Sequence, residues 1–364
     1  MDASGGVHVA RFLTLRERQQ LRCVCRRWLF TCPWLQFVGG VQPSKSVWNL
    51  ESRRFRHVWH TYMHRESEQL LPHVLRRLPR VEKPDTEELK KGLCASTNTG
   101  VRPSFDNTHA RSGYIQAKMN RCGNLPNLLM TEELSELRSE IFRVASERRQ
   151  WTIALYGGGP GFDTAGLVLL RKFLRADEVC FHTHVYDNEP GWASAVTAVQ
   201  QALREVHDDD STWCFKSCDI TLDVNDAVNA AVQHDVAETQ LFVFSFVCVE
   251  NFQLLQQSSF AFLRSLFRDA RDGSVFLFTD STHRLWPLIY DEAVRVHGTQ
   301  FRVWTPFGRG CHYALVLQKL PSGAQGPDGT CPFFAQAVAK LALFRRHHHE
   351  QWRDRGSAEN EELH

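Results

Sequence analysis

The chain has 364 residues, of which 43% are hydrophobic and 23% are charged, and its formal net charge is +2. This composition is typical of a globular protein with room for two domains, and it excludes fibrous and low-complexity classes. The longest apolar run, 241–249, is far shorter than the roughly 20 residues of a membrane-spanning helix. We therefore expect no membrane segment.

The cysteine pattern bears on the compartment. The 11 cysteines are scattered without paired spacing, which argues against a disulfide framework and against a zinc site. The N-terminus lacks the apolar stretch of a secretory signal. We expect reduced cysteines, no bound metal, and a cytoplasmic or nuclear protein.

The first segment, 1–91, is predicted to be helical. In 12–30, Thr14 is a plausible helix cap, and Leu15, Leu21 and Trp28 recur on one apolar face opposite arginines. The letters VCRRW in this helix resemble the later part of an F-box. That resemblance implies that a Skp1-type adaptor binds through 9–34, with Leu15, Leu21 and Trp28 at the contact. The alternative is an ordinary amphipathic helix with a chance VCRRW.

Charge is unevenly distributed along the chain. Residues 1–150 contain 25 Lys/Arg and 15 Asp/Glu, a balance of +10, and the remainder has a balance of −8. Aromatic and basic residues also alternate between 48 and 62. Such a segment favours either an acidic partner such as RNA or core packing of the aromatics beneath exposed arginines.

The next segment, 92–113, is rich in Ser, Thr, Asn and Gly and is predicted to be a linker. From 114 to 319, helices alternate with apolar strands, which predicts a parallel, doubly wound α/β sheet. The predicted strands are 151–156, 179–186, 213–218, 241–248, 274–279, 301–304 and 313–318. The last two form a terminal β-hairpin, which NAD-binding Rossmann domains generally lack. Segment 320–364 is expected to contain a helix near 332–346 and a flexible tail.

The strongest chemical signal is WTIALYGGGPGFDTAG at 151–166, where an apolar strand runs into Gly157, Gly158, Gly159 and Gly161 and then into a helix. Glycine is needed where a backbone turns sharply or lies against a ligand. The N-terminus of the following helix offers free N–H groups. This pattern suits either a dinucleotide pyrophosphate or the methionine carboxylate of S-adenosylmethionine.

Two acidic residues follow the next strands. Asp187 stands at the end of the second strand, 26 residues past Gly161, where a carboxylate accepts hydrogen bonds from ribose hydroxyls. Asp219 and Ile220 end the third strand. A resemblance to S-adenosylmethionine-dependent methyltransferases implies that they lie next to the adenine. The alternatives are a polar turn for Asp187 and a helix cap for Asp219.

Taken together, residues 151–319 resemble class I S-adenosylmethionine-dependent methyltransferases. The resemblance implies a seven-stranded sheet with the last hairpin inserted in it, and S-adenosylmethionine as cofactor. It also implies that Ser245 and Phe246, at the end of the fourth strand, border the methionine and the substrate. Glu250 and Asn251, just beyond, are the substrate-side candidates. One departure is Leu155, which stands where many members carry an acidic residue, and Asp163 is a candidate to compensate.

The sequence therefore predicts a methyltransferase acting on RNA or protein. The alternative is an F-box adaptor of a ubiquitin ligase whose methyltransferase-like domain is catalytically inactive and recognises a target. A nucleotide-binding oxidoreductase is disfavoured by the terminal hairpin. No motif names the methyl acceptor or a catalytic residue.

Overall fold

A computed structural model describes residues 45–99, 105–131, most of 133–141, 150–174, 176, 179–297, 301–306, 313–321 and 337–345. The predicted F-box-like segment 9–34, with Leu15, Leu21 and Trp28, lies outside the described residues.

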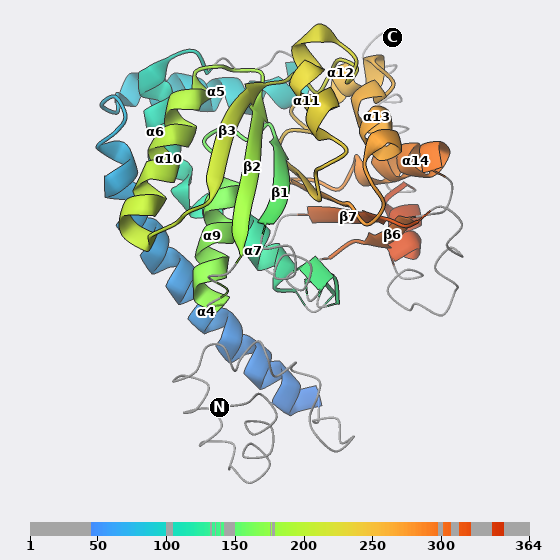
Figure 1. The fold of residues 1–364 in the computed structure, drawn as a ribbon, viewed down its shortest axis with the longest axis horizontal. Coiled ribbons are helices and arrows are strands. Elements are labelled where there is room, and N and C mark those ends of the chain that lie inside the picture. The colour runs from blue at the N-terminus through green and yellow to red at the C-terminus, as the bar shows by residue number, and fades with distance from the viewer. Residues whose placement is uncertain are drawn as a thin grey trace, which may run out of the picture.

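Seven strands form one mixed sheet in the order β3-β2-β1-β4-β5-β7-β6 (Figure 1). The strands are β1 (Gln150–Tyr156), β2 (Cys180–Asp187), β3 (Thr212–Ser217), β4 (Leu241–Ser245), β5 (Val275–Asp280), β6 (Phe301–Trp304) and β7 (Tyr313–Lys319). β1 to β5 pair in parallel, whereas β7 runs antiparallel between β5 and β6. This confirms the predicted methyltransferase-type sheet with its inserted terminal hairpin.

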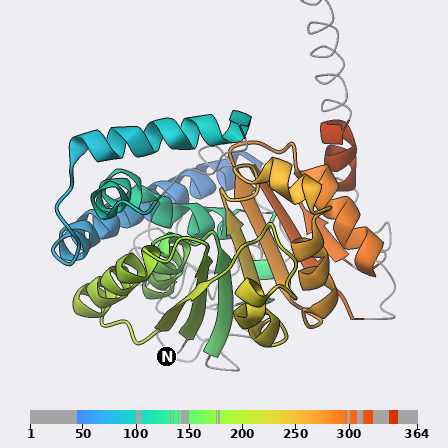
Figure 2. The ribbon, with the colours of Figure 1, turned by 90° about the horizontal axis from the view of Figure 1, so that it is seen from above.

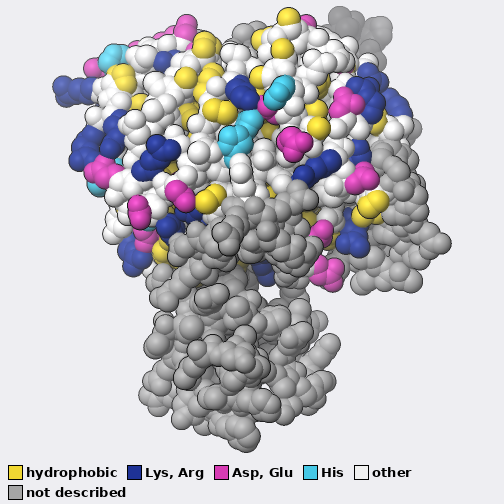
Figure 3. Space-filling view, in the orientation of Figure 1, with side chains coloured by type: hydrophobic (Ala, Val, Ile, Leu, Met, Phe, Trp, Pro, Cys, Tyr) yellow, Lys and Arg dark blue, Asp and Glu magenta, His cyan; other side chains and the backbone are white. Residues whose placement is uncertain are grey.

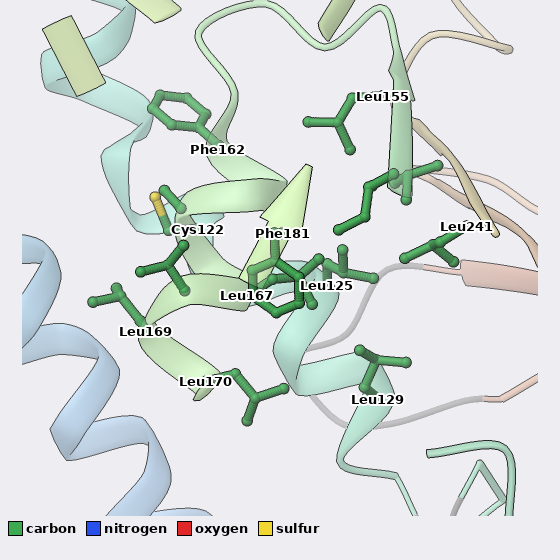
Figure 4. Close-up of a cluster of buried hydrophobic side chains, with 14 of the residues drawn as sticks. Cys122, Leu125, Leu129, Leu155, Phe162, Leu167, Leu169, Leu170, Phe181 and Leu241 are labelled. Atoms are coloured by element: carbon green, nitrogen blue, oxygen red, sulfur yellow. The ribbon is translucent and has the colours of Figure 1, made fainter. Parts of the chain in front are cut away.

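Helices cover both faces of the sheet (Figures 1 and 2). One face carries α4 (Lys45–Leu75), α6 (Thr108–Lys118), η1 (Met119–Gly123), α7 (Asn124–Leu129), α9 (Phe162–Leu174) and α10 (Trp192–His207). The other carries η2 (Ala227–Asn229), α11 (Ala230–Asp235), α12 (Phe252–Gln257), α13 (Ala261–Asp269) and α14 (Trp286–His297). Alternating strand residues supply two cores, so that Ile153 and Leu155 face one layer and Ala154 and Tyr156 face the other. Figure 4 shows the first of these cores, to which Leu155 of β1 and side chains of α7 and α9 contribute.

The described residues of the predicted linker 92–113 are largely helical, which corrects that expectation. Helix α5 (Lys83–Thr99) runs through its first part and α6 begins at Thr108. Asn107 caps α6 because its side-chain oxygen accepts hydrogen bonds from the backbone N–H groups of His109 and Ala110. A Cβ on Gly113 would lie 1.9 Å from the Thr86 hydroxyl. That glycine therefore permits close packing of α5 against α6 rather than marking a loop.

Helix α4 shares a core with the sheet-covering helices instead of standing apart from them. The rings of Trp59 and Tyr62 each lie 4.9 Å from the ring of Phe173 on α9. The Trp59 indole N–H donates a hydrogen bond to Asn127, and the Tyr62 hydroxyl donates one to the Leu169 carbonyl. These two aromatics are buried, so they serve core packing rather than a nucleic-acid surface.

Near the C-terminus, residues 337–345 are helical, within the predicted helix 332–346. Ala337 and Leu341 are buried in the second core. Lys340 donates a hydrogen bond to the Thr305 carbonyl, and Arg345 pairs with Asp291 on α14. This helix therefore closes the layer that also contains α14.

Candidate functional site

A pocket opens at the edge of the sheet where β1 to β4 end. The strand order reverses direction between β1 and β4, and in open α/β sheets ligands bind at this switch point, outside the carboxyl ends of the strands. The pocket is lined by residues that follow each of these four strands. The topology alone therefore brings together the strand-end motifs identified in the sequence.

The glycine loop forms one wall of this pocket. Gly157 and Gly159 have φ values of +61° and +47°, in the left-handed region that favours glycine. A Cβ on Gly157 would lie 2.4 Å from the Val247 side chain, so the loop also needs glycine for close packing. The Gly158 N–H donates to the Tyr186 carbonyl at 3.1 Å, which ties the loop to the end of β2.

Gly161 was predicted to approach the cofactor, but the structure places it beside the pocket rather than in its lining. A Cβ there would lie 2.9 Å from the Trp213 ring. Its φ of +81° and its N–H bond to the Gly158 carbonyl close the turn into α9. The glycine is required by the turn and by Trp213, whose position on β3 could not be inferred from the motif.

Asp187 connects β2 to the glycine loop. One carboxylate oxygen accepts the Gly159 N–H at 3.0 Å, and the other accepts the Glu189 N–H at 3.1 Å. Burial raises the pKa of Asp187 to about 6, although these backbone hydrogen bonds oppose the rise. Each carboxylate oxygen keeps a second lone pair, so Asp187 holds the loop and still has acceptors for ligand hydroxyls.

Asp219 and Ile220 line the pocket beyond β3. A carboxylate oxygen of Asp219 accepts both the N–H and the hydroxyl of Thr221, which fixes the turn. The helix that follows is capped instead by Asp226, which accepts the Val228 N–H. The alternative of Asp219 as a helix cap is therefore wrong.

Residues that precede β1 also line the pocket, and the sequence did not predict this. We call Phe105, Tyr114 and Arg121 the roof of the pocket. Its aromatic members, Phe105 and Tyr114, pack against Trp192 with ring centroids 5.1 and 5.7 Å away. Arg121, from η1, donates a hydrogen bond of 2.8 Å to the Tyr114 hydroxyl. The only sequence signals for this roof were single aromatics and one arginine among many.

Arg121 is the one basic side chain among the described residues that line the pocket. Its guanidinium lies 4.3 Å from the centre of the Phe246 ring. Phe246 itself has a φ of +61°, which is unusual for a side chain of this size and indicates local strain. Arg121 is thus held between Tyr114 and the end of β4.

The positions of Leu155 and Asp163 bear on the departure noted in the motif. Leu155 is buried in the core between β1 and α9, away from the pocket lining. Asp163, in the first turn of α9, lines the pocket. Burial raises the pKa of Asp163 to about 6, opposed by a hydrogen bond with Ser245 and by the positive charge of Arg121. The pocket therefore has a carboxylate supplied from α9.

Glu250 and Asn251 lie on the turn after β4. Burial and the negative charge of Asp280 raise the pKa of Glu250 to about 8, and Arg121 opposes the rise. The Asn251 amide donates to the Val247 carbonyl, so its side chain holds this turn. Asp280 accepts the Val249 N–H and thereby fixes the same turn from β5.

Ten of the eleven predicted cofactor-side and substrate-side residues line the pocket, Gly161 being the exception. Those ten are Gly157, Gly158, Gly159, Asp187, Asp219, Ile220, Ser245, Phe246, Glu250 and Asn251. Within the described ranges, no cluster of His, Cys, Asp or Glu is arranged to hold a metal ion. Nor does any helix in those ranges combine the length and apolar character needed to cross a membrane.

The sequence matches no protein-family model, and no curated protein sequence matches it either. Solved structures do resemble its fold. A putative class I S-adenosylmethionine-dependent methyltransferase from Listeria monocytogenes is 11% identical, with a TM-score of 0.35 over 77% of this chain and 99% of that one. A 16S rRNA (adenine(1408)-N(1))-methyltransferase from Catenulisporales acidiphilia, solved with its cosubstrate, is 13% identical, with a TM-score of 0.31 over 50% and 89%.

A precorrin-6y C5,15-methyltransferase from Geobacter metallireducens is 8% identical, with a TM-score of 0.29 over 50% of this chain and 89% of that one. Because all three TM-scores are below 0.5, the fold assignment rests on the strand order and pairing of this chain.

Proposed function

We propose that this chain is an S-adenosylmethionine-dependent methyltransferase. The observation that carries the proposal is the glycine loop at the end of β1, held by Asp187 at the end of β2, in a sheet with an inserted antiparallel β7. The combination supplies backbone close to a ligand and a carboxylate acceptor beside it. The inserted strand separates this sheet from NAD-binding Rossmann domains.

Each part of the cofactor can be assigned to residues that line the pocket. Asp187 would accept the ribose hydroxyls, and Ile220 with Asp219 would contact the adenine. Asp163 would face the methionine ammonium group, and Arg121 would pair with the methionine carboxylate. When bound, the cofactor supplies an electrophilic methyl group on a sulfonium, and the protein's task is to hold it in line with the acceptor.

Asp163 bears on the alternative of an inactive domain. That alternative gained weight from Leu155, because the family's usual carboxylate is missing there. A carboxylate from α9 in the same pocket supports cofactor binding despite Leu155. The adaptor function itself depends on residues 9–34 and stays a sequence-based prediction, as does a macromolecular acceptor, RNA or protein.

A thermal-shift experiment with S-adenosylmethionine, S-adenosylhomocysteine and NAD tests the proposal. A ligand that binds only the folded state stabilises it by about 2.7 kcal/mol at 100 times its Kd. Both adenosyl amino acids are expected to raise the melting temperature, and NAD is not. A shift with NAD alone, or none with any of the three at millimolar concentration, would overturn the proposal.

A further inference from the structure

The charge of the pocket points to the kind of acceptor it takes. Its described lining contains four carboxylates, from Asp163, Asp187, Asp219 and Glu250, and a single guanidinium, from Arg121. S-adenosylmethionine carries a sulfonium, an ammonium and a carboxylate, for a net charge of +1. A bound cofactor therefore leaves an excess of negative charge in a partly buried site.

Glu250 is the carboxylate that the cofactor assignment leaves unused. It lines the pocket on the turn after β4, on the substrate side of the site. Within the described part of the chain its carboxylate makes no hydrogen bond or ion pair, and its side chain is half-buried. A half-buried carboxylate without a partner is available to a polar or charged group that enters the pocket.

The surroundings of Glu250 suit a cation. The charged groups that act on it are Asp280 on β5, Arg121 on η1 and Asp187 on β2, so carboxylates outnumber cations around it. Phe246 and Tyr114 line the same pocket, and the Arg121 guanidinium lies 4.3 Å from the centre of the Phe246 ring. Aromatic faces attract cations, more strongly where water is excluded.

We propose that the methyl acceptor is an amine, which enters as an ammonium ion and gives its proton to Glu250. The positive charge of the ammonium opposes the burial and the Asp280 charge that keep Glu250 protonated in the free protein, so its carboxylate is ionised when the amine is bound. This inference rests on the proposed methyltransferase function. Once the proton moves to the Glu250 carboxylate, the nitrogen lone pair attacks the methyl carbon. The carbon–sulfur bond breaks, and its electron pair stays on sulfur. The products are a methylated ammonium, neutral S-adenosylhomocysteine and protonated Glu250.

The same charges disfavour an acceptor that brings phosphates into the site. The described face in Figure 3 shows basic and acidic side chains interspersed, with no continuous basic surface there for a nucleic-acid backbone. RNA is therefore the competing outcome of the test rather than part of the proposal.

Methyl transfer from isotopically labelled S-adenosylmethionine tests the proposal with the full chain. The acceptors are free lysine, spermidine, a synthetic lysine-rich peptide and bulk transfer RNA. The variants are the wild type, Glu250→Gln, and Glu238→Gln as a matched control on an exposed glutamate outside the pocket. The affinity for S-adenosylhomocysteine is measured in parallel.

The expected result is methylation of one or more amines by the wild type and by Glu238→Gln. The peptide and the small amines distinguish a protein-borne source from a metabolite. Glu250→Gln should lower kcat at pH 7 by roughly 100-fold or more, the usual range for a lost general base, with S-adenosylhomocysteine affinity within about threefold. Its rate should recover toward pH 10, where the free amine is present in solution.

Two outcomes would overturn the inference while leaving the proposed function intact. One is methylation of transfer RNA but of no amine. The other is amine methylation by Glu250→Gln at the wild-type rate and pH profile. Loss of S-adenosylhomocysteine binding in the wild type would instead remove the proposed function, and the inference with it.

Discussion

The carboxylate of Asp187 accepts a hydrogen bond of 3.0 Å from the backbone N–H of Gly159. The two residues lie 28 positions apart, on the turns after β2 and β1, and both line the pocket. Because a charged acceptor strengthens such a bond, this contact fixes the left-handed turn at Gly159. The contact therefore holds one wall of the pocket in place.

Gly159→Ala and Gly273→Ala form a matched pair. Both glycines have positive φ, +47° and +83°, and an added Cβ has room at each. Each substitution should cost about 1–2 kcal/mol of folding free energy through backbone strain. Only Gly159→Ala should also weaken S-adenosylhomocysteine binding, because its methyl group enters the pocket beside Trp192. Urea unfolding and calorimetry measure the two effects, and equal affinities would show that the loop is only a structural turn.

Arg121→Met tests the assignment of the methionine carboxylate. Loss of a charged hydrogen-bond donor should cost about 1.5–3 kcal/mol, and so weaken S-adenosylhomocysteine roughly 10-fold to 100-fold. Adenosine has no carboxylate and should bind the variant and the wild type equally. Arg284→Met, on an exposed turn, is the control. If adenosine weakens as much as S-adenosylhomocysteine, Arg121 shapes the roof rather than pairing with the carboxylate.

The buried carboxylates predict how stability depends on pH. The folded state holds a proton on Glu250 up to about pH 8, whereas the unfolded chain releases it near 4.5. The folded state thus binds more protons over this interval, and the free energy of unfolding falls as pH rises. Asp163, Asp187 and Asp280, each with a pKa raised to about 6, act in the same direction.

Glu250→Gln should therefore match the wild type in stability near pH 4 and exceed it by about 2–4 kcal/mol at pH 9. Urea unfolding at the two pH values measures the difference, with Glu238→Gln as the control. A constant difference at both pH values would contradict the raised pKa of Glu250.

The sequence predicted the strand ends well because their signals are local. An apolar strand followed by Gly157 or Asp187 indicates that the chain turns directly after that strand. Because the strands are parallel, these turns then lie at the same edge of the sheet. Arg121 and Tyr114 gave no such signal, because their place in the pocket depends on how α6 and η1 pack over α9. Gly161 was predicted to approach the cofactor because the motif does not reveal its packing against Trp213, which lies 52 residues further along the chain.

Isothermal titration calorimetry of S-adenosylhomocysteine against the wild type and Asp187→Ala tests the central claim most directly. We expect the wild type to bind one ligand per chain. Asp187→Ala loses both the ribose acceptor and the brace on Gly159, so its Kd should rise roughly 10-fold to 100-fold. Asp226→Ala, which removes a helix cap outside the pocket, should bind like the wild type. Absence of binding to the wild type at millimolar ligand, or equal Kd values for the wild type and Asp187→Ala, would contradict the account.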